Sequence, residues 1–310
     1  NYLQVSFSEV DTDIENEMSI LVNSGSTAIV RVYSKASKDA RADASSSFDL
    51  ILNNNNTELD RKTMAVTVNP DHAINLQGST TYSSQPGTII QSSFNLINLG
   101  NLLENNVSFN VVLPNDSQSG TWQFESIQNF SVSPGAANSI EVIMNITIPD
   151  IGPNVMLVAG ESFSVPIQIF SYDFTELNGD YLILGMTTLT ITIEPYFDLD
   201  ITTSFENMRL VPGQTRVFEY TVLNAGNAPA LVNMNWDLNV DDASRWTVEI
   251  SNLLSTSFTI PIGEIYTIAM QITPVATDHY VGELGTFDII FVSADDAEET
   301  QEYSTEVVIV

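Results

Sequence analysis

Carboxylates are the side chains of this sequence that are grouped closely enough to do chemistry together. They form two clusters: Glu9, Asp11, Asp13, Glu15 and Glu17 in one, and Asp295, Asp296, Glu298, Glu299 and Glu302 in the other. A calcium ion takes about six to eight oxygen ligands, which closely spaced carboxylates in a loop can supply. Both clusters are therefore candidate calcium sites, and calcium is the one cofactor that the sequence suggests. A solvated acidic turn is the alternative, because acidic loops are common on protein surfaces.

Other catalytic or metal-binding groups are scarce. The chain has no cysteine, which excludes a disulfide, a thiolate metal site and a cysteine nucleophile. The two histidines, His72 and His279, have no neighbours at the spacing that zinc ligands need. The Gly-x-Ser-x-Gly motif of a serine hydrolase is absent as well. We therefore predict a protein that is not an enzyme.

The charge balance excludes two classes of partner. The sequence carries 39 Asp and Glu against nine Lys and Arg, for a formal net charge of −30. No Lys or Arg occurs between Asp71 and Met208. Such a surface repels nucleic acid and anionic lipid headgroups. The apolar stretch "YLILGMTTLTITI" is too short and too rich in threonine to span a membrane. We expect no nucleic-acid binding and no membrane insertion within this sequence.

Asparagine supplies a further kind of candidate site. The pattern Asn-x-Ser/Thr, which is the acceptor for N-glycosylation, occurs at Asn55, Asn106, Asn115, Asn129 and Asn145. These positions could carry glycans in a secreted protein. A chain this rich in Asn, Ser and Thr also produces about that number by chance.

An internal repeat is the strongest signal of organisation. The phrase "PGTIIQSSFNLINLGN" at residues 86–101 returns as "PGQTRVFEYTVLNAGN" at residues 212–227, an offset of 126 positions. Shorter matches follow in the same order, such as "TWQFES" with "RWTVEI" and "AGESFSVPIQIF" with "LGTFDIIF". The chain therefore uses one building unit more than once.

The start of the chain contains only part of this unit. Residues 1–70 carry "ILVNSGSTAIVRVY", "SSSFDLIL" and "MAVTVNP", which match the later part of the repeat, and nothing that matches its opening phrase. The predicted domains are thus residues 1–70, a half unit, followed by 71–195 and 196–310, two whole ones. We call them the first, second and third units. The chain opens on Asn1 without an initiator methionine, and we expect it to be a piece of something longer.

The hydrophobic pattern predicts the fold of each unit. Apolar residues alternate with polar ones over short stretches, separated by clusters of Asn, Gly, Pro and Asp. This period of two is typical of half-buried strands. The fold class is therefore all-β, with tandem antiparallel sandwiches of about seven strands per whole unit.

The boundaries between units have a common composition. Each is a strand, one acidic or amide residue, a proline and a new strand, as in "VNPDHAINL" and "IEPYFDLDI". The absence of a Gly/Ser linker predicts a stiff connection. The acids at these boundaries, Asp71, Glu194, Asp198 and Asp200, are a third calcium candidate.

The third unit carries a family resemblance. Its phrases "VPGQTRVFEYTVLNAGNAPALVNMNWDL" and "IPIGEIYTIAMQITP" resemble the immunoglobulin-like domain associated with NPCBM modules in alpha-galactosidases. They are also similar to the cell-adhesion-related domain of bacterial and archaeal surface proteins. The resemblance implies immunoglobulin-like domains on a secreted or surface-anchored protein, and it brings no catalytic residues.

The tryptophans are candidates for binding sugars by stacking. Trp122 and Trp246 occupy equivalent positions in the repeat, which favours a role as buried core anchors. Trp236 has no counterpart in the second unit and is the better candidate for a surface contact, although packing is favoured for it too.

These observations predict a structural or adhesive protein. We expect a stiff stalk or lattice segment of an extracellular or cell-surface protein. The alternative is a carbohydrate-binding or accessory module of an extracellular glycosidase. The half unit predicts an apolar face around Ile20, Val22, Ile29, Phe48 and Leu50. An upstream polypeptide, a neighbouring copy through self-association, or docking onto the second unit would cover this face. A small sheet that stands alone is the alternative.

Overall fold

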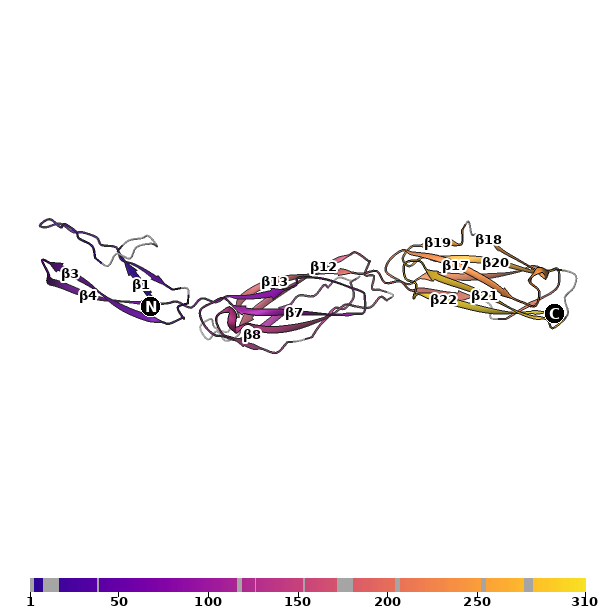
Figure 1. Cartoon of the computed structure of the whole chain (residues 1–310), viewed down its shortest axis with the longest axis horizontal. Helices are drawn as coiled ribbons and strands as arrows, with labels where there is room; N and C mark the ends of the chain where they lie inside the picture. The colour runs from indigo at the N-terminus through magenta and orange to yellow at the C-terminus, as the bar shows by residue number, and fades with distance from the viewer. Residues whose placement is uncertain are drawn as a thin grey trace.

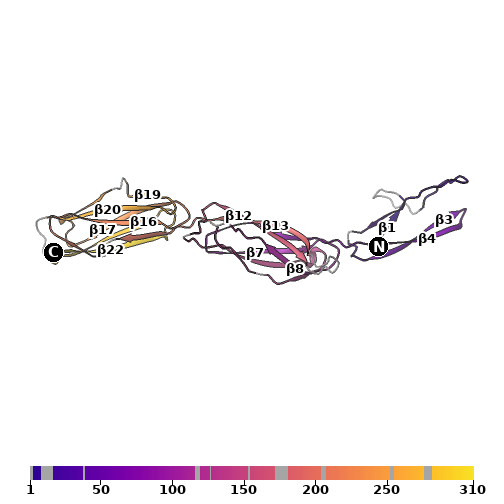
Figure 2. The same ribbon diagram turned by 180° about the vertical axis from the view of Figure 1, so that it is seen from behind.

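The three units lie in a row and give the chain an extended shape, as this computed structural model shows from two sides (Figures 1 and 2). The structure describes residues 3–7, 17–37, 39–115, 119–125, 127–152, 154–171, 181–203, 207–251, 255–275 and 281–310. The first unit is at one end of the row, and the C-terminus is at the other.

The second unit is a sandwich of two sheets. A four-stranded sheet has the order β5-β7-β11-β9, and a five-stranded sheet has the order β10-β8-β12-β13-β6. The strands are β5 (Ile74–Gly78), β6 (Thr81–Ser84), β7 (Ile89–Asn98), β8 (Glu104–Val111), β9 (Gln123–Phe124), β10 (Phe130–Val132), β11 (Ile140–Thr147), β12 (Ser162–Ser171) and β13 (Leu182–Ile193). A short 3₁₀ helix, η1 (Ala136–Asn138), precedes β11.

The third unit repeats this arrangement strand for strand. Its sheets have the orders β14-β16-β20-β18 and β15-β22-β21-β17-β19. The strands are β14 (Leu199–Thr203), β15 (Asn207–Leu210), β16 (Arg216–Asn224), β17 (Ala230–Asn239), β18 (Trp246–Ser251), β19 (Ser257–Ile260), β20 (Ile265–Pro274), β21 (Leu284–Ser293) and β22 (Thr300–Ile309). The 3₁₀ helix η2 (Ala243–Arg245) precedes β18.

The prediction of an all-β sandwich is confirmed, with two corrections. Within the described residues each whole unit has nine strands instead of about seven. In addition, one pair per unit is parallel, β6 with β13 and β15 with β22. The parallel pair and one of the additional strands arise because the opening segment of the unit starts in one sheet and then crosses to the other, so that it forms two short strands.

Alternation along the strands builds one core per whole unit. In β7, Phe94 and Leu96 point inward and are buried, while the residues between them are exposed. Tyr220 and Val222 of β16 repeat this arrangement. The core of the second unit draws on residues between 74 and 193, and the core of the third unit draws on residues between 199 and 309.

The first unit is much smaller. It consists of two separate two-stranded sheets, one of β1 (Leu3–Ser6) with β2 (Tyr33–Ala36) and one of β3 (Ser45–Asn54) with β4 (Thr57–Thr67). The β3–β4 turn contains Asn55 and Asn56, whose positive φ angles of 47° and 65° suit a tight hairpin turn.

The β3–β4 hairpin corresponds to hairpins of the whole units. In the second unit the backbone N–H of Gly160, just before β12, donates to Ile193 O at the end of β13 over 2.8 Å. The equivalent bond in the first unit joins Asp43 N to Val68 O at 2.9 Å. Hairpins β3–β4, β12–β13 and β21–β22 are therefore the same element, used three times.

The apolar face predicted for the first unit is only partly covered. Ile20, Val22 and Ile29 are exposed. Phe48 and Leu50 are half-buried and line a small pocket of about 170 Å³ between the two sheets. The described part of the first unit therefore contains no closed sandwich.

Candidate functional site: the junctions between units

The repeated Asn-x-Gly-Asn phrase contains two asparagines with different roles. The first of them, Asn98 or Asn224, is fully buried. The Nδ2 of Asn224 donates to Ala228 O at 2.8 Å and to Ile260 O at 2.9 Å, and its Oδ1 accepts from Gly226 N at 3.0 Å. Asn98 makes the same three bonds with Leu102, Val132 and Gly100 at 2.7–2.9 Å. This asparagine therefore fixes the turn within its own unit.

The second asparagine binds the segment that enters the unit. The side chain of Asn227 accepts from Tyr196 N at 2.7 Å and donates to Glu194 O at 3.0 Å. Its backbone N–H donates to Tyr196 O at 3.0 Å. Because residues 194–196 form the connection between the second and third units, Asn227 holds that connection against the body of the third unit.

Asn101 makes the same contacts one junction earlier. Its Oδ1 accepts from Asp71 N at 2.8 Å, and its Nδ2 donates to Asn69 O at 3.0 Å. The backbone N–H of Asn101 donates to Asp71 O at 3.0 Å. Both junctions are thus closed by one pattern of hydrogen bonds.

The same asparagines also contact the preceding unit directly. Asn227 O accepts from Ala159 N, in the turn before β12, at 3.0 Å. Asn101 O accepts from Ala42 N, in the turn before β3, at 3.0 Å. We call the four bonds made by each of these asparagines the asparagine latch. The latch joins the end of one unit, the connecting segment and the start of the next.

The glycine of the phrase makes room for the latch. A Cβ atom at Gly226 would collide with Tyr196 O, and one at Gly100 would collide with Asp71 O. These are the carbonyls that accept from the backbone N–H groups of Asn227 and Asn101. Glycine is required here because the connecting backbone passes too close for any side chain.

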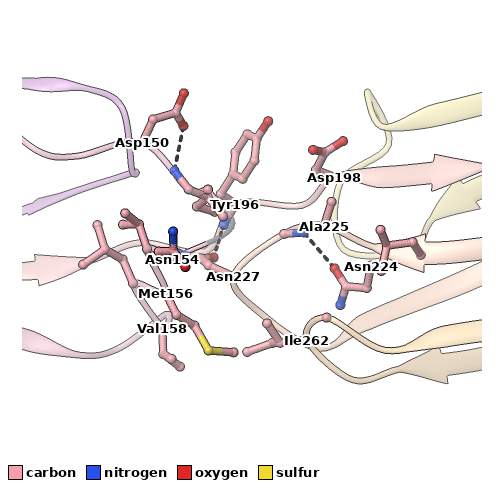
Figure 3. A pocket seen from close by; sticks show the side chains of 17 residues that line it. Asp150, Asn154, Met156, Val158, Tyr196, Asp198, Asn224, Ala225, Asn227 and Ile262 are labelled. Atoms are coloured by element: carbon pink, nitrogen blue, oxygen red, sulfur yellow. Dashed lines mark hydrogen bonds between the residues drawn. The ribbon is translucent and has the colours of Figure 1, made fainter. Parts of the chain in front are cut away.

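A cleft lies beside the latch between the second and third units (Figure 3). Its volume is about 880 Å³. Met156 and Val158 approach it from the second unit, and Ile262 approaches it from the third, as Figure 3 shows. Asp150 and Asp198 stand on either side of Tyr196 in this view. The cleft therefore combines an apolar floor with acidic edges.

Acidic groups at this junction lack a nearby cation. Burial raises the pKa of Asp198, and the charges of Glu299 and Asp200 raise it further. The pKa of Tyr196 is also raised, mainly by burial and next by Asp198 and Asp150. None of the residues that line the cleft is Lys, Arg or His. The described residues that line the cleft therefore bring no positive charge to offset the repulsion between these acids.

The predicted acidic cluster of the third unit forms a turn that satisfies its own backbone. This turn links β21 to β22. Asp295 accepts from Leu231 N, and Asp296 accepts from Glu298 N at 3.1 Å. Glu299 accepts from Leu199 N at 3.1 Å and so ties the turn to the first strand of the unit. Three of the five carboxylates of this cluster, Asp295, Asp296 and Glu299, thus serve as hydrogen-bond acceptors in the fold.

Calcium binding stays a prediction. Of the first cluster, Asp11, Asp13 and Glu15 lie outside the described residues, and Glu17 is exposed. Among the described residues, no group of three or more Asp, Glu or His is arranged to hold a metal ion. The third candidate included Asp71, whose backbone belongs to the latch, and Glu194, whose side chain accepts from Ser83 Oγ.

Of the aromatic candidates, Trp122 and Trp246 lie in the cores as predicted, whereas Trp236 is partly exposed. Nδ1 of His72 lies 2.8 Å from Oε1 of the buried Glu104, whose pKa is raised by burial against the opposing effect of His72. His279 lies outside the described residues. Trp122 and Trp246 are buried in the two cores. Trp236 is 41% exposed, and its ring stacks on Phe287 with centroids 5.9 Å apart.

The glycosylation motifs differ in accessibility. Asn55, Asn106, Asn115 and Asn129 are exposed. Asn145 is half-buried in β11, and its Nδ2, the atom to which a glycan is attached, donates to Glu125 at 2.7 Å. Asn145 is therefore the poorest acceptor of the five in the folded chain.

Comparison with known proteins gives similarity in fold alone. No protein-family model matches the chain, and no curated protein matches it. Domains 4 and 5 of the S-layer protein SbsC match over 53% of this chain and 69% of theirs, at 16% identity and a TM-score of 0.24. The sialic-acid-binding region of a Streptococcus sanguinis adhesin matches over 77% of this chain and 78% of its own, at 9% identity and a TM-score of 0.25.

A third similar structure is a family 123 glycoside hydrolase from Clostridium perfringens. It matches over 36% of this chain at 8% identity, with a TM-score of 0.29, and this chain spans 27% of its length. Scores and identities this low carry no argument about function. The solved structures that resemble the chain thus include S-layer, adhesin and hydrolase proteins, and the resemblance to the NPCBM-associated family is not confirmed.

The sequence did not reveal the latch. The Asn-x-Gly-Asn phrase begins at Asn98 and Asn224, the last residues of β7 and β16. One signal could have shown more. Asn101 and Asn227 each follow a glycine directly, at equivalent positions of the repeat. Each whole unit also begins with a segment next to a proline, and a stiff connection requires contacts that fix this segment.

Proposed function

We propose that this chain is a stiff, non-catalytic structural segment of a secreted or cell-surface protein, either a stalk or a lattice module. The observation that carries the proposal is the asparagine latch, which closes both junctions with the same four hydrogen bonds. A protein that only needed to connect domains could use a flexible linker. Repetition of one latch at both junctions favours a role that depends on fixed spacing and direction.

The connection between units also supports stiffness. Pro195 lies two residues after the end of β13, and Gln85 of the second unit donates to Pro195 O at 3.0 Å. The neighbouring Glu194 N donates to Ser84 O at 2.9 Å. The connecting segment is thus bonded to the unit before it as well as to the unit after it. Few backbone groups of the connection are left to rotate freely.

Surface location is part of the proposal. The surface takes its polarity from Asp, Glu, Ser, Thr and Asn, and the chain has no cysteine. Four of the five glycosylation motifs are exposed, as an extracellular protein would allow. Within the described residues, no helix is long and apolar enough to cross a membrane.

Spin-label distances between units test stiffness directly. Because the chain has no cysteine, labels can be placed cleanly with Asn95→Cys in the second unit and Glu219→Cys in the third. We expect one narrow distance distribution by double electron–electron resonance. Its width should match that of a control pair within the third unit, Glu219→Cys with Asn235→Cys. A distribution several times broader than the control would reject a stiff segment.

A second candidate function rests on Trp236. Its ring is partly exposed and lies flat on Phe287, an arrangement that could stack on a sugar. This observation favours the carbohydrate-binding module over a purely structural role. A glycan array with the wild-type chain and with Trp236→Ala tests it. Binding that the substitution abolishes would support the module, and no binding to any glycan would remove it.

A further inference from the structure

The first unit corresponds, segment by segment, to the second half of a whole unit. Strand β1 pairs with β2 as β9 pairs with β11 and as β18 pairs with β20. The glycines that precede β2, β11 and β20 are Gly25, Gly135 and Gly263, and all three have positive φ angles, of 77°, 98° and 69°. The hairpin β3–β4 then corresponds to β12–β13. The order of elements is therefore conserved from β1 to β4.

Four strands of a whole unit have no counterpart in the described part of the first unit. They are the equivalents of β5, β6, β7 and β8. In the second unit β8 pairs with β12, β6 pairs with β13, and β5 and β7 build half of the facing sheet. The described pairings of β3 and β4 are only with each other. Within the described residues, both outer edges of this hairpin and most of its inner face are thus left open.

Equivalent side chains show what is uncovered. Leu52 and Met64, on the inner face of the β3–β4 hairpin, are 51% and 41% exposed. Their equivalents in the second unit, Ile169 and Leu189, are buried. The difference lies in the missing strands, because the hairpin itself is the same. An open apolar face next to two unpaired strand edges is a surface suited to added strands.

The opposite face of the hairpin is already satisfied. Arg61 donates to Asp49 at 2.6 Å and to Glu58 at 2.8 Å. Thr63 donates to Asp49 at 2.7 Å, and this bond lowers the pKa of the Asp49 carboxyl first, with Arg61 adding to it. These groups form a polar, solvent-facing surface like that of a finished sandwich. The face of the β3–β4 hairpin that is available for a partner is therefore the apolar one.

One hydrogen bond defines the chemistry of that partner. In the whole units, the buried Asn98 donates to Val132 O, and Asn224 donates to Ile260 O. Counted from the positive-φ glycine, the equivalent of both carbonyl residues is Val22, which is 47% exposed, whereas Val132 is fully buried. Residues 17–32 carry no strand in the structure. The strands that correspond to the Ile20–Val22 stretch are β10 and β19, and they pair only with β8 and β17. The first unit has no described equivalent of β8 or β17 with which this stretch could pair.

A second copy of this chain would not supply the missing strands. The equivalents of β5–β8 in the second and third units are already committed to closed sandwiches with their own cores. The first unit of another copy would bring the same half again. The partner must instead be the complementary half.

We propose that the open face of residues 1–70 binds a four-stranded polypeptide segment of this same repeat, with the pattern of residues 71–119. In the complex, one strand of the segment pairs with β3 as β8 pairs with β12. The first asparagine of its Asn-x-Gly-Asn turn donates to Val22 O. The Ile20–Val22 stretch then becomes the edge strand that β10 and β19 represent in the whole units.

Grafting the missing half onto the full chain tests this proposal. Residues 71–120 are fused directly before Asn1, which reproduces the order in which β8 precedes β9. A second donor, residues 196–244, is fused in the same way. Six of the nine Lys and Arg residues lie in the first unit, and the second unit contains none, so trypsin reports almost selectively on the first unit. We expect either graft to slow native-state cleavage at Arg31 by about tenfold or more.

Matched controls keep the outcomes distinct. A graft whose copy of Asn98 is changed to Ala should protect Arg31 markedly less than the intact graft. Equal protection by this variant would overturn the role of the asparagine at Val22. Failure of both donors to slow cleavage would overturn the docking proposal. Protection of the ungrafted chain that grows with its own concentration would overturn it in favour of pairing between copies.

Discussion

The hairpin β3–β4 of the first unit and the hairpin β12–β13 of the second unit invite a direct comparison. Both begin after a turn that contacts the next unit's asparagine, and both are closed by equivalent backbone hydrogen bonds. Leu50 in β3 corresponds to Ile167 in β12 and has the same inward direction. Ile167 is fully buried, but Leu50 is only half-buried.

This comparison shows that the sequence of a strand does not by itself determine whether the strand is buried. Alternation fixes which side chains share a face, because successive residues point to opposite sides of a strand. Whether that face is buried depends on strands elsewhere in the unit, here on β5, β7 and β8. The second unit has these strands, and the described part of the first unit lacks their equivalents.

The largest effect should appear when matched core residues are truncated. We expect Ile167→Ala to lower the free energy of unfolding of the second unit by about 4 kcal/mol, because it leaves a cavity in a closed core. Leu50→Ala should cost the first unit about 1 kcal/mol or less, since the side chain is already half in water. Hydrogen exchange read separately for each unit measures both. Equal losses at the two positions would contradict the half-open description of the first unit.

A smaller loss of stability is expected from truncating the buried asparagine, Asn98 or Asn224, that begins the Asn-x-Gly-Asn phrase of each whole unit. Asn224→Ala leaves two buried carbonyls and one N–H without their partner, so the third unit should lose about 3 kcal/mol. Asn98→Ala should do the same to the second unit and leave the first unchanged. The control is Asn235→Ala, an exposed asparagine in β17, which should shift stability by about 0.5 kcal/mol or less. Denaturation can be followed by Trp122 and Trp246 fluorescence, and equal losses in variant and control would refute this role.

The pH dependence at the second junction should be weaker still. The pKa of Asp198 is raised in the folded chain, so its contribution to stability is present at low pH and is lost as pH rises through that raised value. Asp198→Asn removes the buried charge and should raise the melting temperature slightly at pH 7. The gain should shrink as the pH falls through that raised pKa, because the native carboxyl is then protonated. A destabilised Asp198→Asn at pH 7 would contradict the assignment.

The smallest effect is expected from calcium. Asp295, Asp296 and Glu299 already accept backbone N–H groups, so a calcium ion would have to compete with these hydrogen bonds. Millimolar calcium should therefore change the melting temperature of the third unit no more than magnesium does. A calcium-specific rise that Asp295→Asn abolishes would show instead that this turn is a metal site.

The sequence predicted much of the fold because its signals are local. Alternation within strands and the recurrence of Pro-Gly and Asn-x-Gly-Asn phrases indicated all-β units in tandem. The predicted number of strands was too low, in part because the opening segment of each whole unit crosses between sheets at a point that the hydrophobic alternation does not mark. The parallel pairs β6–β13 and β15–β22 follow from that crossing.

The junction could not be predicted in the same way. Asn101 and Asn227 act on backbone groups about 30 residues earlier in the chain, and such contacts exist only once the sheets have assembled. For the acidic clusters, the calcium site that charge density predicts stays a prediction. Nothing in the sequence indicated that Asp295, Asp296 and Glu299 accept backbone N–H groups of their own turn and of neighbouring strands.

Small-angle X-ray scattering tests the central claim, that the asparagine latches hold the units in one extended row. The wild-type chain should give a scattering profile that fits the arrangement in Figure 1. The double variant Asn101→Ala/Asn227→Ala should give a smaller radius of gyration and a broader distribution of distances, while tryptophan fluorescence shows that the whole units remain folded. A double variant as extended as the wild type, or a wild-type chain that is already compact, would contradict the account.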